Sequence, residues 1–291
     1  MFFLLAVLAM IGYAFQGALI ASCYRRLDRL SVVAYRGMAL GIGMAPLLFF
    51  AGPIDPAVVR ASLPWIIASA AVASFGNWCG ANAYSFLPLG IASAIFTSLA
   101  AIVAVVLSWA ALGERLSPAQ LAWIALILLG VVLLSAARST GPLPRDFDLR
   151  RGIVHATLYG ILLGIAYVIL GRASRQVHPF LAGFAWELAI GIFAAAIAVA
   201  RGWAGDRPLV AVSPRDFGKI FAFASPSILG TACFTMAMRL GPMGIATAIV
   251  STMIVVKTLL AMALYRERPT VRQWCLLAAI CATVVGLKLA S

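Results

Sequence analysis

The chain has 291 residues, of which 64% are hydrophobic and 11% are charged. Soluble domains contain roughly 25% charged residues, so the composition excludes a soluble globular protein and indicates an integral membrane protein. The formal net charge is +13, but the Lys and Arg residues lie mainly in short turns between apolar stretches. Such charges are typical of the lipid headgroup region, and we expect a lipid bilayer, not a nucleic acid, as the partner.

Ten apolar stretches are long enough to cross a bilayer, which takes about 20 residues in a helix. We expect membrane-spanning helices at residues 2–23, 31–51, 63–86, 90–112, 117–137, 152–171, 179–200, 217–239, 244–265 and 271–289. The first stretch has no basic segment before it and no evident cleavage site, so it is predicted to be a span and not a removable signal. The sequence thus predicts an all-α, multi-pass membrane protein.

The first two predicted spans each carry polar side chains. Tyr13 and Gln16 lie one helical turn apart in the first span, which makes them candidate substrate-binding residues. Arg36 lies within the first turns of the second span. Its side chain either reaches the lipid headgroups or faces a polar interior, and it is a candidate intramembrane charge.

The third predicted span is the most polar of the first half. One helical stripe, with the spacing i, i+4, i+8 and i+11, is formed by Ser74, Trp78, Asn82 and Ser85, and Asn77 lies next to it. Lipid cannot satisfy the hydrogen bonds of amide groups, so the stripe is expected to face protein or water. Two interpretations stay open: substrate binding by Asn77, Trp78 and Asn82, or hydrogen bonding between helices without substrate contact.

The middle of the chain leads from the fifth span to the sixth. The fifth span is apolar on nearly all faces, which predicts contact with lipid or with another subunit. The sixth span carries the small residues Gly160 and Gly164, whose spacing favours close helix packing. Tyr159 and Tyr167 of the same span are candidate substrate-binding residues.

The second half holds two further charges inside predicted spans. Glu187 lies in the seventh span, and Lys257 lies near mid-depth in the ninth. The eighth span has a polar stripe at four-residue spacing that contains the candidate binding residues Thr231 and Thr235, and Ser251 of the ninth span is another candidate. The tenth span is as uniformly apolar as the fifth.

An internal repeat organises the chain. Residues 88–95 recur as residues 242–249, with six of the eight positions identical at an offset of 154. A short acidic-basic turn follows each copy, at residues 113–115 and again at residues 266–268. A repeat of about half the chain length indicates two copies of one structural unit.

The repeat divides the chain into a first unit at residues 1–137, a linker at residues 138–151 and a second unit at residues 152–291. Each unit has five spans, an odd number, so the second unit enters the membrane from the opposite side. Inverted repeats of this kind place a substrate near the bilayer midplane at the interface of the units. The sequence therefore predicts transport by alternating access.

Lys257 is the most informative single residue, because an ammonium group at mid-depth costs about 2.5 kcal/mol or more unless it is paired or hydrated. We expect it to recognise an anionic group of the substrate, with Tyr and Trp rings against the apolar part. The alternative is a permanent structural pair of Lys257 with Glu187. Glu187 is also a candidate proton carrier, which would make transport proton-coupled.

The residues that carry the repeat resemble a known family. Residues 83–92, the turn at residues 113–117 and the later Gly130-Val131-Val132 are similar to the EamA-type unit of the drug/metabolite transporter superfamily. Residues 240–268 resemble its second copy, although Arg266 stands where the pattern has Gly. The resemblance covers essentially the whole chain and implies ten helices in two inverted five-helix repeats.

Members of that family enclose a central cavity with helices one, three, four, six, eight and nine, and place helices five and ten at the periphery. The resemblance implies that the polar stripes of spans three and eight line the cavity, as do Tyr13, Gln16, Tyr159, Tyr167 and Ser251. It implies a protein of the cell inner membrane, either a monomer or a homodimer through helices five and ten. The expected activity is efflux of a small-molecule substrate, an amino acid or related carboxylate-bearing metabolite, with metabolite uptake as the alternative.

The charge distribution and the family resemblance predict different sides of the membrane for the two termini. When every Lys and Arg outside the second and ninth spans is assigned to its nearest connection or tail, the odd-numbered connections hold 14 and the even-numbered connections and the tails hold 6. The positive-inside rule therefore favours both termini outside. Members of the resembled family more often have cytoplasmic termini, so the two arguments disagree.

Other functional classes lack support in the sequence. A membrane-embedded enzyme needs a cluster of metal ligands or a nucleophile with a base, and neither the two histidines nor the one acid within a span supplies this. The five cysteines have no paired spacing, so we expect no metal site and no cofactor. A channel would favour continuous rings of pore-lining residues over two inverted units with sparse polar stripes.

Overall fold

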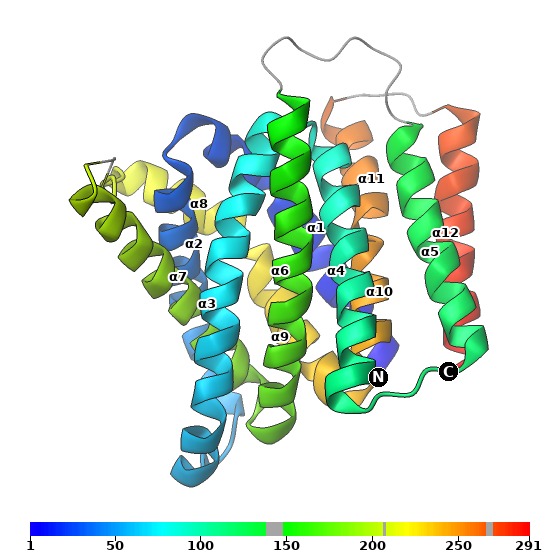
Figure 1. Cartoon of the computed structure of the whole chain (residues 1–291), viewed down its shortest axis with the longest axis horizontal. Helices are drawn as coiled ribbons and strands as arrows, with labels where there is room; N and C mark the ends of the chain where they lie inside the picture. The colour runs from blue at the N-terminus through cyan, green and yellow to red at the C-terminus, as the bar shows by residue number, and fades with distance from the viewer. Residues whose placement is uncertain (138–147, 206–207, 266–269) are drawn as a thin grey trace.

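The computed structural model describes residues 1–137, 148–205, 208–265 and 270–291 (Figure 1). Within these ranges every regular element is helical. The first half contains α1 (Phe2–Arg26), α2 (Arg29–Met44), the short 3-10 helix η1 (Ala45–Phe50), α3 (Pro56–Phe86), α4 (Leu89–Leu112) and α5 (Pro118–Ala136). The second half contains α6 (Leu149–Gln176), α7 (Pro179–Trp203), α8 (Pro214–Ala224), α9 (Pro226–Leu240), α10 (Met243–Ser251), α11 (Met253–Tyr265) and α12 (Val271–Leu289).

Nine segments of the described chain are helical, long and apolar enough to cross a membrane; α2 with η1, α8 with α9 and α10 with α11 each count as one segment. Helix α5 adds a shorter apolar stretch at Pro118–Leu134. The prediction of an all-α integral membrane fold is thus confirmed. The predicted turn at residues 266–268 and most of the predicted linker lie outside the described residues.

The two units run in opposite directions through the molecule. In Figure 1, α4 descends to the turn that precedes α5, whereas α10 and α11, its counterparts in the repeat, ascend. The same reversal relates α3, which ascends, to α8 and α9, which descend. Both termini lie at the lower edge, as an even number of crossings requires, and we call this side of the molecule the terminal face.

The units are interleaved and share one core. Counterpart helices pack against each other across the repeat: α2 against α7, α4 against α10, and α5 against α12. Two further contacts join non-counterpart helices of the two units: α3 packs against α6, and α9 packs against α1. Helices α5 and α12 lie together at one edge of the molecule (Figure 1), the peripheral position that the family resemblance implied.

Small residues let these helices approach closely, and large apolar residues face outward. A Cβ atom added at Gly164 of α6 would lie 2.8 Å from the carbonyl oxygen of Ala100 in α4, so the predicted packing role of this glycine is confirmed. On the outer surface, the side chains of Trp109 and Val285 are more than half exposed. Exposed apolar surface of this kind suits contact with lipid.

Two predicted spans are interrupted. The span predicted at residues 217–239 is broken at Ser225, just before Pro226, which has no N–H to continue the helical ladder. The span predicted at residues 244–265 is broken at Thr252, whose hydroxyl donates to the carbonyl oxygen of Ile249 at 2.6 Å. Such local side-chain bonds compete with helical ones, and interrupted helices are common near the binding sites of transporters.

Candidate functional site

A cavity of about 50 Å³ lies between the two units, and we call it the central cavity. Its walls come from α1, α2, α3 and α4 of the first unit and from α6, α7 and α11 of the second. The lining residues are Tyr13, Gln16, Gly17, Ile20, Tyr24, Arg36, Asn77, Gly80, Ala81, Tyr84, Phe96, Tyr159, Leu163, Tyr167, Trp186, Glu187 and Met253. Seven predicted residues are therefore brought together here: Tyr13, Gln16, Arg36, Asn77, Tyr159, Tyr167 and Glu187.

One wall of the central cavity is a stripe of α1. Tyr13, Gln16, Ile20 and Tyr24 follow the spacing i, i+3, i+7 and i+11, which keeps them on one helical face. The hydroxyl of Tyr13 donates to Oγ1 of Thr231 at 3.2 Å. This bond ties the stripe to α9 of the second unit.

A buried ion pair joins α2 to α7. Arg36 Nη1 lies 3.7 Å from Glu187 Oε2, and the two residues are 5% and 0% exposed. Arg36 therefore faces the interior and does not reach the lipid headgroups, which decides between the two positions expected for it. Thr231 donates its hydroxyl to Glu187 Oε1 at 2.8 Å, so three helices meet at this carboxylate.

The pair is held in place by close contact of the two helix backbones. A Cβ atom added at Gly37, the residue after Arg36, would lie 2.9 Å from the carbonyl oxygen of Glu187. Gly191, one turn after Glu187, faces the backbone of α2 in the same way. Because no side chain separates the helices here, the positions of Arg36 and Glu187 are fixed by the backbone.

Lys257 of α11 lies beside the central cavity and is 1% exposed. Its ammonium group donates to Ser93 Oγ at 2.8 Å and to Tyr84 Oη at 3.2 Å, and Nζ lies 5.5 Å from the ring centroid of Phe96. A Cβ atom at Gly17 would lie 2.9 Å from Nζ, so the glycine of α1 makes room for the lysine. Two hydroxyl groups thus accept from Lys257, and Glu187 is paired with Arg36.

A second hollow, of about 460 Å³, opens at the face opposite the termini, and we call it the vestibule. It is lined by Tyr24, Arg25, Arg26, Leu27, Asp28, Arg29, Trp78, Asn82 and Arg201. Tyr24 lines both hollows. The predicted residues Trp78 and Asn82 thus belong to the vestibule and not to the lining of the central cavity.

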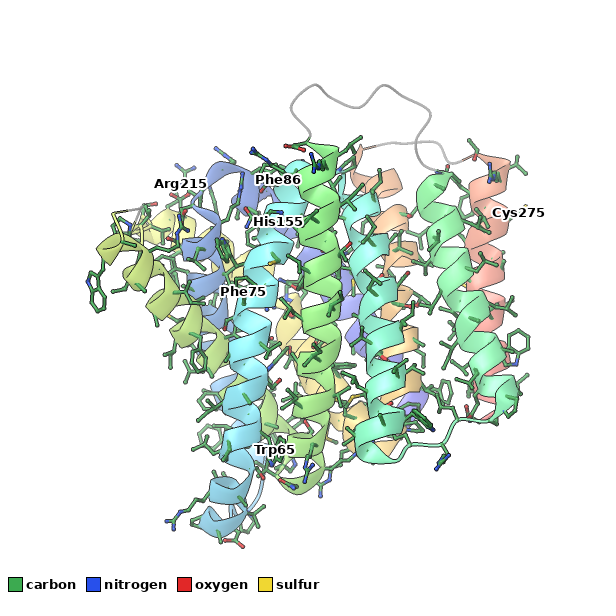
Figure 2. The ribbon with its side chains drawn as sticks, in the orientation of Figure 1. Trp65, Phe75, Phe86, His155, Arg215 and Cys275 are labelled. Atoms are coloured by element: carbon green, nitrogen blue, oxygen red, sulfur yellow. The ribbon has the colours of Figure 1, made fainter. Side chains whose placement is uncertain are left out.

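Basic and aromatic groups alternate around the vestibule. Arg29 Nη1 donates to Asn82 Oδ1 at 2.7 Å, and the guanidinium of Arg29 lies 4.7 Å from the ring centroid of Phe86. Figure 2 shows Phe86 at the end of α3, beside His155 of α6 and far from Trp65 at the other end of the helix. The arginines give this face of the molecule a positive rim.

The remaining two predicted residues bond to their own helices. Thr235 donates its hydroxyl to the carbonyl oxygen of Thr231 at 2.9 Å, and Ser251 donates to that of Ala248 at 2.7 Å. Both side chains are buried, and neither lines the central cavity. Their place as substrate ligands stays a prediction.

Tyr24, Tyr84, Phe96, Trp186 and Met253 line the central cavity but were not among the predicted site residues. The signal for Tyr24 was present in the sequence, since it continues the spacing of Tyr13 and Gln16 by two turns. Tyr84 likewise follows Asn77 at i+7, which puts it on the cavity face of α3. No spacing singled out Phe96 or Met253, because aromatic and apolar residues are common on every face of a membrane helix.

The chain matches known proteins in sequence and in fold. A family model described as "EamA-like transporter family" matches residues 1–136 and 150–289. Among 29 matching chains of solved structures, one described as "Crystal structure of protein" has a TM-score of 0.72 and 19% identity, and the match covers 99% of this chain and 95% of that chain. At this identity the likeness shows the fold alone. A comparison with curated proteins found no match.

Proposed function

Because the chain belongs to the EamA-like transporter family, we propose that it is a secondary transporter that exports a small carboxylate-bearing metabolite, an amino acid or a related compound, across the cell inner membrane. The observation that carries the proposal is the position of Lys257. Its ammonium group is buried at the interface of the two units, next to residues that line the central cavity.

Charge in the site favours an anionic substrate. Arg36, Glu187 and Lys257 are buried around the central cavity, and two of these are cations against one carboxylate. The hydroxyl oxygens of Ser93 and Tyr84 accept from Lys257 and hold its ammonium beside the cavity. A substrate carboxylate near Lys257 would make a charge-assisted contact with this ammonium, and the rings of Tyr84 and Phe96 would contact the apolar part of the molecule.

The dimensions of the site support alternating access. The central cavity of about 50 Å³ is much smaller than the roughly 300–1,000 Å³ of typical metabolite pockets, so a substrate requires the surrounding helices to separate. The interruptions at Pro226 and Thr252 place bends in two of the spans that would move. Inverted repeats supply two equivalent openings, one on each face.

The vestibule supports export as the direction. Its arginines would concentrate anions at the face opposite the termini. The excess of Lys and Arg in the odd-numbered connections favours this face as the cytoplasmic one. An anionic metabolite would then be collected from the cytoplasm and released on the terminal face.

The test is a flux assay in inverted membrane vesicles with a panel of amino acids, their amides and dicarboxylates. We expect the wild-type protein to accumulate at least one carboxylate-bearing compound, and we expect Lys257→Gln to abolish this accumulation while the variant still elutes as a folded species. Lys288→Gln, which changes an exposed lysine of α12, is the matched control and should transport normally. Wild-type flux in folded Lys257→Gln would refute the assignment.

A further inference from the structure

Three polar atoms of residues that line the central cavity have no hydrogen-bond partner within the described chain. They are Arg36 Nε, Trp186 Nε1 and Glu187 Oε2, and all three side chains line the cavity. Arg36 and Trp186 are 5% and 3% exposed, and Glu187 is fully buried. Arg36 Nε and Trp186 Nε1 are N–H donors, and Glu187 Oε2 is an acceptor.

The other atoms of these groups are already engaged. Glu187 Oε1 accepts from Thr231, and Arg36 Nη1 approaches Asn77 Oδ1 at 3.5 Å. The 3.7 Å between Arg36 Nη1 and Glu187 Oε2 exceeds a hydrogen-bond distance, so this contact leaves Oε2 open. Buried polar groups are almost always bonded, and three open atoms around one cavity indicate a place for a ligand group.

We propose that Arg36, Trp186 and Glu187 form a second recognition point that binds a substrate group offering both an acceptor and a donor. The acceptor would bind Arg36 Nε and Trp186 Nε1, and the donor would bind Glu187 Oε2. Since the Arg36–Glu187 pair is formally neutral, the bound group is uncharged or zwitterionic, whereas Lys257 takes an anionic group. The inference rests on the proposed function and specifies its substrate as a bifunctional compound with one net negative charge.

The test measures binding of three probes to the purified protein by thermal shift and calorimetry. L-Glutamate has a zwitterionic group and a separate carboxylate; glutarate lacks the ammonium donor, and L-glutamine lacks the second carboxylate. We expect L-glutamate to bind at least about tenfold more tightly than either of the others, because each lacks one charge-assisted interaction. Equal affinities, or no binding by any probe, would overturn the inference.

Trp186→Phe tests this donor, because it keeps an aromatic ring and removes the N–H together with part of the indole. It should weaken L-glutamate binding about fivefold to tenfold, and the melting temperature of the ligand-free protein should fall only by the lost packing of a buried ring. Trp109→Phe, at an exposed site on α4, is the matched control. Unchanged L-glutamate binding by the folded Trp186→Phe protein would contradict the inference. Flux of another anion in the vesicle assay would leave the proposed function standing.

A different observation concerns the turn after α4, which belongs to the repeated acidic-basic motif. Gly113 adopts a φ of 67° and turns the chain, so that Glu114 reaches into the second unit. Its carboxylate accepts from Met243 N at 2.9 Å and Gly244 N at 3.4 Å, at the start of α10, and it pairs with Arg175 of α6. A carboxylate at a helix N-terminus is favoured by the helix dipole.

The other face of the molecule has a related arginine. Arg175 Nε donates to the carbonyl oxygen of Met238 at 3.2 Å, and Arg25 Nε donates to that of Tyr84, also at 3.2 Å. The two bonds are equivalent in the repeat, since Met238 and Tyr84 lie 154 residues apart. Arg25 lines the vestibule of about 460 Å³, and Arg175 is bound to Glu114 on the terminal face.

We further infer that Glu114, Arg175 and the first N–H groups of α10 form a clasp that holds the terminal face closed and must open for release there. A cysteine at Ala9 reports on this opening. Ala9 lies one turn before Tyr13 on α1, nearer to the N-terminal end of that helix, and is fully buried. In a background without the five native cysteines, Ala9→Cys should react slowly with a maleimide.

Adding Glu114→Gln should increase the maleimide rate at position 9 by at least about tenfold, because the ion pair is lost, and Glu114→Asp should restore part of the protection. Asp216→Asn is the control, since Asp216 also lies near a helix N-terminus but bonds within its own helix. Ala81→Cys, on the vestibule side of the cavity, should not become more reactive. Unchanged protection of position 9, or equal gains at positions 9 and 81, would overturn the inference.

Discussion

The buried pair of Arg36 and Glu187 leads to a quantitative prediction about stability. At 3.7 Å the attraction is about 4 kcal/mol for an effective dielectric constant of 20. Arg36→Met keeps the length and removes the charge, which leaves the carboxylate of Glu187 at 0% exposure. Breaking a buried pair from one side typically costs about 3–5 kcal/mol, and we expect a loss in that range.

A double-mutant cycle separates the pair from the packing of each side chain. Unfolding free energies of Arg36→Met, Glu187→Gln and the double variant are measured by denaturant titration in mixed micelles. The double variant should be more stable than the sum of the single effects predicts, by at least about 2 kcal/mol, because no unpaired charge is left behind. Arg215→Met, at an exposed position of α8 visible in Figure 2, should be neutral. Additive single effects would refute the reasoning.

Three further predictions follow from the site and its packing. Glu187→Gln should abolish the response of substrate flux to a pH gradient if the carboxylate carries the proton, and unchanged coupling in the vesicle assay would exclude that role. Gly17→Val should lower flux without unfolding, because its side chain would displace the ammonium of Lys257; normal flux would contradict the assigned position. Gly164→Leu should destabilise the protein by roughly 1–3 kcal/mol in the same titration, because the added side chain would meet the backbone of α4.

The fold could be predicted because its determinants are local and repeated. Apolar stretches of helix length directly indicate membrane spans. The repeat of residues 88–95 at residues 242–249 indicates two units of inverted topology. The interruption at Thr252 was missed: its hydroxyl bonds to the carbonyl oxygen of Ile249, but Thr97 and Thr258 make similar bonds within continuous helices. Threonine is common in continuous membrane helices as well, so the residue type alone carries no signal for a break.

The candidate site was predicted best where one helix presents one stripe. Tyr13 and Gln16 line the central cavity as a stripe of α1 should, but the stripe of α3 was assigned from its polar residues and the cavity face is rotated from it. Ser74 donates to the carbonyl oxygen of Ile190 in α7, and Trp78 and Asn82 reach the vestibule. Polarity marks a face that avoids lipid, but only the packing of neighbouring helices decides whether that face meets protein, water or substrate.

The departures from symmetry are what give this site its polarity. Lys257 occupies the position that Val103 occupies in the first unit, 154 residues earlier. Val103 packs against Gly164 of α6, and Lys257 lies against Gly17 of α1. Both are contacts between the units at a glycine, but the first is made by a methyl group and the second by an ammonium group. Arg36 and Glu187 likewise lie on counterpart helices with opposite charges. The inverted backbone relates the two halves of the cavity wall, and these differences make the halves unequal; under the proposed function, this would favour one orientation of a substrate with unlike ends.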